Sequence, residues 1–274
     1  MEFGLLGPLS VIDRGSDKTP TAPKQRQMLA VLLLNANHVV SMEQFVYELW
    51  ERNPPSSAIA ALYTYIMQLR RTMGGRPVDD DTPSGRLIRR SRGYQLEVLP
   101  GELDLDVFED RVRAARNALA RNENESAAQQ LRAALGMWRA QLLVDVTTGP
   151  VLNAAIAVIE RRRLDAIGQR ISADLHLGRH HELIGELSAL VYHHATNEDL
   201  AAQLMLALYR SGRQADALAA FHVLRRALSE DLGAAPTQRM HQLYMDILSA
   251  HPRLEMSSGT QTPLSLDLIT ALAS

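Results

Sequence analysis

The chain has 274 residues, of which 46% are hydrophobic and 22% are charged, as in an ordinary globular protein. At about 100–200 residues per domain, this length predicts one or two domains with a sizeable core. Cysteine is absent, which excludes disulfide scaffolds, thiolate zinc sites and cysteine nucleophiles. The formal net charge of −2 gives no global indication of a nucleic-acid partner.

The charge is unevenly distributed along the chain. Residues 1–100 hold 12 Lys or Arg against 10 Asp or Glu, whereas residues 101–274 hold 17 against 21. Seven arginines lie close together in the first part: Arg70, Arg71, Arg76, Arg86, Arg89, Arg90 and Arg92. Such a cluster is a candidate phosphate-binding surface, although charge alone equally allows an ordinary solvated surface.

The N-terminus has no basic stretch followed by an apolar run, so we expect no secretory signal. The longest apolar stretches, residues 28–34 and 154–159, are far shorter than the ~20 residues that span a bilayer. We therefore expect a cytoplasmic protein with no membrane partner.

The first part of the chain mixes strands and helices. Residues 3–12 predict short strands broken by Gly-Pro turns. An apolar stripe predicts a helix over about residues 24–35. Ser41, with Gln44 three residues later, predicts a capping box at the start of a second helix. That helix would end at Trp50, before two prolines.

A third helix is predicted from Ser56 or Ser57 to the glycine pair at residues 74–75. At 100° per residue, one face forms a core stripe of Leu62, Ile66, Leu69 and Met73. The opposite face holds Ala60, Thr64, Gln68 and Arg71, with Ala61 and Met67 beside it and Arg70 on the flank. Small, polar and basic residues suit a helix in the DNA major groove, but an ordinary amphipathic surface helix has the same pattern.

Residues 86–90 and 93–98 predict a hairpin with arginines near its turn. Gly93 would allow this hairpin to approach a helix closely. Strands, three helices and an arginine hairpin, in this order, predict a winged helix-turn-helix. In that fold the third helix enters the major groove and the wing reaches an adjacent minor groove, where arginine is favoured.

After Pro100 the chain reads as helix pairs. Gly178 and Gly212 are 34 residues apart, and alignment on them places Leu187 opposite Phe221. This period is typical of tetratricopeptide repeats, with a generic helical bundle as the alternative. The predicted fold class is an α+β N-terminal winged helix-turn-helix followed by an all-α tetratricopeptide-like domain. Because such repeats usually bind protein, the second domain predicts a partner or self-association surface.

A histidine cluster and an arginine cluster are two further candidate sites. His176, His180 and His181 lie near His193 and His194, but a Gly-Arg turn interrupts them and no carboxylate completes a metal site. Arg161, Arg162 and Arg163 follow an acidic residue, which favours a solvated helix face over nucleic-acid binding. No phosphate loop, nucleophile elbow or dinucleotide fingerprint is present. We expect no enzyme, no cofactor and no metal.

The first part also resembles a known fold family, the OmpR/PhoB-type winged helix. The residues that carry this resemblance are Phe45–Trp50, Pro54-Pro55, Ala58, Leu62, Ile66–Arg71 and Gly93-Tyr94. More narrowly, residues 1–252 resemble the SARP family, the Streptomyces antibiotic regulatory proteins. Lys24–Ala30 is similar to the first helix of that family, and Leu103–Phe108 is similar to the opening of its activator domain.

The resemblance implies three regions and a function. Residues 1–100 would form the DNA-binding domain, residues 101–252 a bacterial transcriptional activator domain, and residues 253–274 a flexible tail. The chain would activate a secondary-metabolite (antibiotic) gene cluster by binding direct repeats near the promoter. Its partners would be double-stranded promoter DNA, RNA polymerase through its sigma factor and other subunits, and a second copy on DNA. Such a protein is nucleoid-associated.

By position, eight residues match the DNA-binding residues of the family: Lys24, Thr64, Gln68, Arg70, Arg71, Arg89, Arg90 and Arg92. The lysine and the two helix arginines would hold phosphates, Thr64 and Gln68 would read bases, and the wing arginines would enter the minor groove. The alternative is a protein-interaction scaffold in which the winged helix is a docking module.

The sequence departs from the family pattern at three places. Glu51 follows the tryptophan where a glycine is usual, so the local turn is expected to differ. Met67 stands where a polar or basic residue is common, which argues against a phosphate contact there. Ser91-Arg92 replaces a proline-containing wing tip, which predicts a more basic wing.

Overall fold

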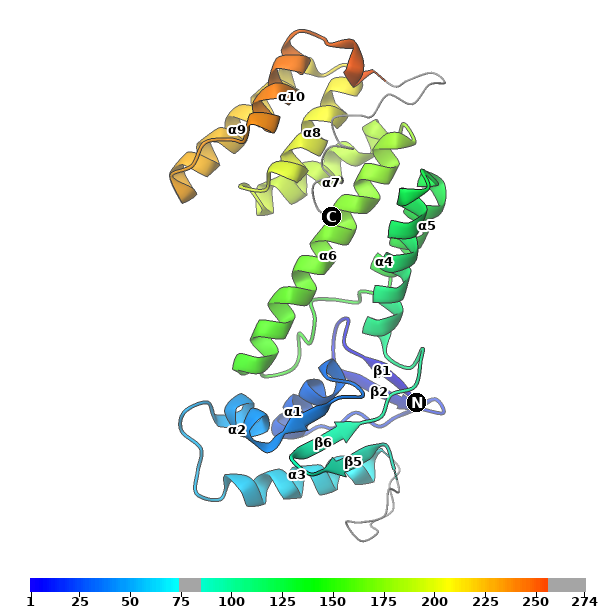
Figure 1. Ribbon diagram of the computed structural model, residues 1–274, viewed down its shortest axis with the longest axis vertical. Helices are drawn as coiled ribbons and strands as arrows, with labels where there is room; N and C mark the ends of the chain where they lie inside the picture. The colour runs from blue at the N-terminus through cyan, green and yellow to red at the C-terminus, as the bar shows by residue number, and fades with distance from the viewer. Residues whose placement is uncertain (74–84, 256–274) are drawn as a thin grey trace. The chain divides into compact units, whose positions relative to one another are not determined.

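The computed structural model describes residues 1–73 and 85–255 (Figure 1). Two compact units are present. The first comprises residues 1–113 and 132–164, and the second comprises residues 114–131 and the chain from residue 165 onward. The first unit is therefore larger than the expected DNA-binding domain of residues 1–100, and its additional segments are explained by the contacts described below.

The first unit contains two small antiparallel sheets (Figure 1). One consists of β1 (Glu2–Gly4), β2 (Ser10–Asp13) and β3 (Ser16–Asp17) in sequence order. The other has the order β4-β6-β5, with β4 (Val39–Ser41), β5 (Leu87–Arg90) and β6 (Gly93–Leu96). The predicted hairpin is confirmed as β5–β6, whereas β4 was not expected.

Three helices complete the winged helix: α1 (Pro23–Leu34), α2 (Met42–Trp50) and α3 (Ala58–Thr72). The capping box is confirmed, because Ser41 Oγ accepts from the Gln44 amide and Gln44 Oε1 accepts from the Ser41 amide. The predicted core stripe of α3 is also confirmed, since all four of its side chains are buried. The glycine pair proposed to end α3 lies outside the described residues.

Gly93 is required for close approach, but not to a helix as expected. A Cβ at this position would lie 1.9 Å from the Val40 carbonyl oxygen. Gly93 pairs with Ser41 in the β4–β6 ladder. The prediction of a helix as the neighbour of Gly93 was wrong. The true neighbour, β4, is only three residues long and gives little periodic signal in the sequence.

A buried carboxylate joins α2 to a distant segment of the first unit. Glu48 on α2 is only 2% exposed. Its Oε1 accepts from the Gly149 amide at 2.6 Å, and its Oε2 accepts from the Val151 and Leu152 amides at 2.9 and 3.0 Å. These amides lie at the start of α6 (Pro150–His176), where helical N–H groups have no intrahelical partner and favour a negative charge.

The same carboxylate has a buried partner on α1. Gln27 Nε2 donates to Glu48 Oε1 at 2.8 Å and to the Glu48 carbonyl oxygen at 3.0 Å. A Cβ on Gly149 would lie 2.1 Å from that carbonyl oxygen, so only glycine allows this approach. Glu48 therefore fixes α1, α2 and the first turn of α6 against one another.

We predict that Glu48→Gln lowers the free energy of unfolding of the first unit by about 2–3 kcal/mol. The amide would remove the negative charge and place an NH₂ group where an acceptor is needed. Both tryptophans lie in the first unit, so urea denaturation followed by tryptophan fluorescence measures the effect. Glu43→Gln, at an exposed position in the first turn of α2, is the control and should change stability by less than about 1 kcal/mol.

The second unit is helical. Its elements come from α4 (Asp104–Ala120), α5 (Asn124–Leu135), the later part of α6, and four further helices. These are α7 (His180–His193), α8 (Glu198–Arg210), α9 (Gln214–Leu232) and α10 (Gln238–Leu248), followed by the short 3-10 helix η1 (Pro252–Leu254).

The 34-residue repeat agrees with the burial of these helices. Gly178 and Gly212 both have a positive φ, of 81° and 75°, in the turns before α7 and α9. The aligned residues Leu187 and Phe221 are both buried. The second unit is thus built from stacked helix pairs, as the period predicted.

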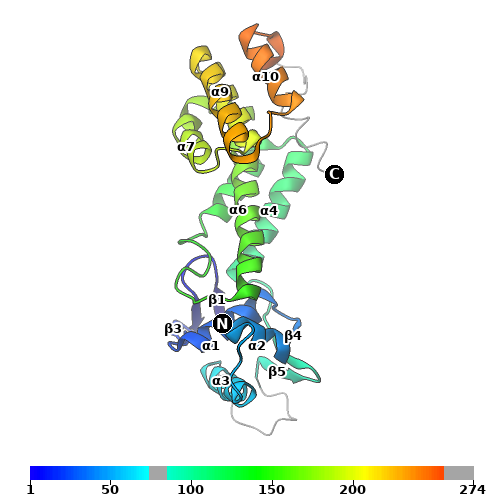
Figure 2. The same ribbon diagram turned by 90° about the vertical axis from the view of Figure 1, so that its left-hand side faces the viewer.

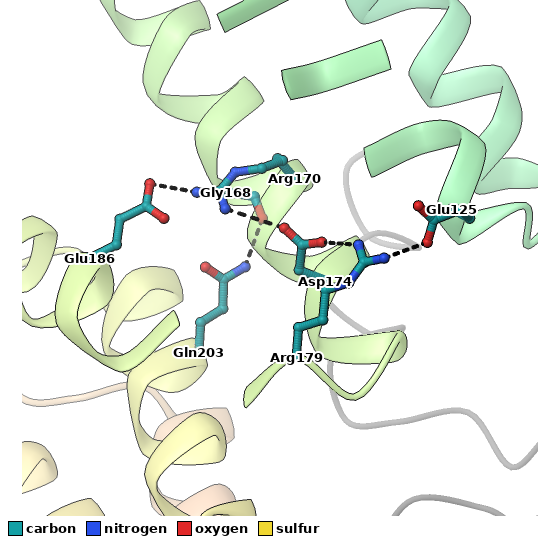
Figure 3. A network of polar contacts seen from close by, with 7 residues as sticks. All are labelled: Glu125, Gly168, Arg170, Asp174, Arg179, Glu186 and Gln203. Carbon is teal, nitrogen blue, oxygen red and sulfur yellow. Dashed lines mark hydrogen bonds and ion pairs between the residues drawn. The ribbon is translucent and has the colours of Figure 1, made fainter. Parts of the chain in front are cut away.

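Polar contacts around a buried aspartate join four helices within the second unit (Figure 3). Asp174 on α6 is 2% exposed and accepts from Arg170 at 3.2 Å and from Arg179 at 2.8 Å. Arg170 also pairs with Glu186 on α7, and Arg179 pairs with Glu125 on α5. The Gln203 amide on α8 donates to the Gly168 carbonyl oxygen. Because breaking one partner would leave a buried charge, this network fixes the helix register.

Candidate nucleic-acid interface

The outer face of α3, the helix shown in Figure 2 beside the β5 strand, consists of two parallel columns of exposed residues. The polar column contains Thr64, Gln68 and Arg71, with the small residue Ala60 at its N-terminal end, and all four are exposed. The apolar column contains Ile59, Tyr63 and Met67, which are 47%, 43% and 39% exposed. The predicted outer face is therefore present, and it includes an apolar column in which only Met67 was noted from the sequence.

Two polar side chains of this face have defined local partners. The Thr64 hydroxyl donates to the Ala60 carbonyl oxygen at 3.1 Å, which leaves its oxygen as an acceptor. Gln68 Oε1 accepts from Gln25 Nε2 on α1 at 2.5 Å. Gln25 thus directs the amide of Gln68, a contribution that the sequence pattern did not indicate.

Lys24 lies at the start of α1 and is half-buried. Its Nζ donates to the Leu49 carbonyl oxygen at 2.6 Å and lies 5.9 Å from the centroid of the Trp50 ring. A cation at the C-terminal end of α2 is favourable, because the last carbonyl groups of a helix carry partial negative charge. This lysine therefore positions the C-terminal end of α2 against α1.

Arg70 bridges α3 and the wing. Its Nε donates to the Leu87 carbonyl oxygen at 3.3 Å, and its guanidinium lies 5.7 Å from the centroid of the Tyr94 ring. These contacts join α3 to both β5 and β6. Arg71, one residue later, is exposed on the outer face.

The wing arginines Arg89, Arg90 and Arg92 are all exposed. Arg90 Nε donates to Gln95 Oε1 at 2.8 Å, and Gln95 Nε2 donates to the Asn37 carbonyl oxygen at 2.9 Å. Gln95 therefore supports Arg90 from the neighbouring strand. The place of Gln95 on the strand that follows the arginines suggests this support, but the β5–β6 register is needed to identify it.

Arg86, which was grouped with the basic cluster, has an internal role at the base of the wing. Both its terminal nitrogens donate to Glu102. Glu102 also accepts from the Leu99 amide at 2.8 Å and from the N-terminal ammonium at 3.1 Å. The Arg86 hydrogen bonds, helped by these donors, lower the pKa of Glu102 from 4.5 to about 2.

We predict that acid destabilises the first unit through Glu102. Because its folded pKa lies below its ordinary value, the stabilisation is complete above about pH 4.5 and is lost as the pH falls toward 2. Urea midpoints of tryptophan fluorescence near pH 6 and near pH 3 should differ less in Glu102→Gln than in the wild type. Glu97→Gln, at a nearby exposed carboxylate, should keep the wild-type difference between the two midpoints. The same difference in Glu102→Gln as in the wild type would reject the assignment.

Two arginines of the cluster at residues 161–163 make contacts within the first unit. Arg163 stacks on Trp138 with its guanidinium 4.2 Å from the ring centroid, and Arg162 pairs with Glu109. Within the described residues, no group of three or more His, Asp or Glu could hold a metal ion. No described helix is both long enough and apolar enough to cross a bilayer.

An exposed helix face beside a basic hairpin, followed by helix pairs, defines a winged-helix transcriptional regulator. Residues 16–96 match the family model for the C-terminal domain of transcriptional regulatory proteins, and residues 103–248 match the bacterial transcriptional activator domain. The chain belongs to the SARP family of Streptomyces antibiotic regulatory proteins. The predicted family and fold class are confirmed.

The chain spans different shares of the lengths of its relatives. Regulatory protein DnrI of Streptomyces peucetius is 38% identical over 273 residues, covering 99% of this chain and 100% of that protein. Regulatory protein AfsR of Streptomyces coelicolor is 36% identical over 95% of this chain, but over only 25% of its own length. The structure of Mycobacterium tuberculosis EmbR in complex with a low-affinity phosphopeptide has a TM-score of 0.86 and 32% identity, covering 99% of this chain and 69% of EmbR.

Proposed function

We propose that this regulator binds promoter DNA sequence-specifically and activates a secondary-metabolite gene cluster. The observation that carries the proposal is a surface formed by two elements that contribute no carboxylate: neither residues 58–72 of α3 nor residues 85–96 around the wing include an Asp or Glu. On this surface the exposed polar column of α3 lies beside a hairpin with three exposed arginines. Double-stranded DNA carries about one negative charge per 1.7 Å, so such a surface is complementary to it.

The proposed contacts follow from the exposure and donor capacity of each residue. Thr64 and Gln68 read base edges in the major groove, with glutamine suited to the paired donor and acceptor of adenine. Arg71 holds a phosphate. Lys24 and Arg70 are secondary phosphate contacts. Each donates to a backbone carbonyl oxygen within the fold. An ammonium group has three donors and a guanidinium group has five, so donors remain for a phosphate. The wing arginines enter the minor groove.

The helical unit supplies the activating function in this proposal. Membership of the family supports binding to direct repeats near the promoter, with two copies side by side. The stacked helix pairs offer surfaces for that self-association or for RNA polymerase, because tetratricopeptide-like repeats bind proteins.

We predict that Arg90→Ala weakens binding to a promoter duplex about three- to ten-fold. Loss of one cation beside phosphate should also reduce the slope of log affinity against log salt by about 0.9. Fluorescence anisotropy over a series of salt concentrations measures both quantities. Arg121→Ala, which removes an exposed arginine paired with Glu123 in the second unit, should change neither, and wild-type affinity for Arg90→Ala would exclude the wing contact.

We predict that Gln68→Ala relaxes base preference at one position while leaving binding to unrelated DNA nearly unchanged. A bidentate base contact discriminates by about 1–3 kcal/mol, so the wild type should prefer its site at least five-fold over a single-pair variant. Competition binding with single-pair variants of a selected site measures the loss. Gln25→Ala should give a weaker form of the same change, and a uniform loss on all sequences would show that Gln68 only contacts the backbone.

A further inference from the structure

The residues of the apolar column of α3 have no role in the DNA contacts proposed above. Ile59, Tyr63 and Met67 lie at intervals of four residues and are between 39% and 47% exposed. The core-facing side chains Leu62 and Ile66 of the same helix are fully covered, at 0% and 1%. The column is therefore not an extension of the hydrophobic core.

We propose that Tyr63 and Met67, with Ile59 at the end of the column, read thymine methyl groups in the major groove. This inference rests on the proposed DNA-binding function and specifies which bases the helix selects. A thymine methyl is the one apolar group on a major-groove base edge, and apolar side chains recognise it by direct contact.

The charge around the column indicates that its occupant is DNA. No Asp or Glu lies anywhere on α3, and Arg71 follows on the same exposed side. The apolar column also runs directly beside the polar column, so any molecule that contacts Gln68 also meets Met67. An A·T pair offers both the adenine acceptor and donor that glutamine binds and the methyl group that methionine contacts.

The spacing of the column makes the inference specific. Residues four apart on a helix are separated by about 6 Å along its axis. Two base-pair steps span about 7 Å. The column therefore predicts methyl contacts at positions about two base pairs apart, one facing Tyr63 and one facing Met67.

The experiment uses the full chain and proceeds in two stages. A preferred site is first selected from a random duplex library by the wild type. Each thymine in that site is then replaced singly by deoxyuridine, which removes only the methyl group, and affinity is measured by fluorescence anisotropy at one salt concentration. Burial of one methyl is worth about 0.8 kcal/mol, so two positions should each lose about four-fold in affinity.

Protein variants assign each methyl to its side chain. Met67→Ala should abolish the deoxyuridine effect at one position and leave it at the other, and Tyr63→Ala should do the converse. Tyr192→Ala and Met245→Ala remove exposed side chains of the same kinds from the second unit, at 82% and 54% exposure. They should retain both effects.

Three results would overturn the inference, and they differ in what else they overturn. If the selected site has a clear sequence preference but no thymine is sensitive to deoxyuridine, the methyl contacts are wrong and DNA binding stands. If Met67→Ala changes the sedimentation of the DNA-free chain and not its base preference, the column is an interface between copies. If no sequence is selected at all, the proposed function fails as well.

Discussion

The first unit depends on one buried negative charge. The Glu48 carboxylate accepts three backbone amides at the start of α6 and a side-chain amide from α1. Removing those donors would leave a charge without compensation in the interior, which is far more costly than losing one hydrogen bond. Because α2 is followed in the chain by α3, this cap ties the winged helix to residues about a hundred positions later in the chain. A DNA-binding domain that ends at residue 100 would lack those donors.

Other carboxylates of the first unit act in a similar way. Asp104 accepts from the Leu5 and Leu6 amides at 2.8 and 3.1 Å, and Asp145 accepts from the Leu9 amide at 2.9 Å. The N-terminal strands are thereby held by residues of the expected activator domain. Burial raises the pKa of Asp104 despite the two amide donors. The winged helix is consequently stabilised by segments beyond it in sequence, which explains why the compact first unit includes residues 132–164.

The sequence predicted what is local and periodic. The capping box at Ser41 and the buried stripe of α3 each lie within a few helical turns, and the 34-residue repeat lies within one continuous stretch of the chain. In each case a local segment contains the whole signal. The contacts of Glu48, Gln25 and Arg86 join residues far apart in the chain, and no periodicity encodes them. Glu51 was noted as an unusual residue for its place, and its φ of 53° shows a backbone that glycine adopts more easily. The apolar column was missed because only the polar residues beside it were expected to face DNA.

The net charge of −2 does not show that several carboxylates of the first unit are internal whereas the wing arginines are exposed. In the first unit, the carboxylates of Glu48, Glu102 and Asp104 bind internal amides and cations. They are therefore directed into the fold and do not offset the arginines of the outer face. The arginines of the wing are exposed on a surface where neither α3 nor the hairpin contributes a carboxylate. A chain with nearly balanced composition can thus present an arginine-rich surface, because several of its carboxylates are bound by internal amides and cations. The acid stability of the first unit and the proposed DNA contacts therefore involve different residues, Glu102 and the wing arginines.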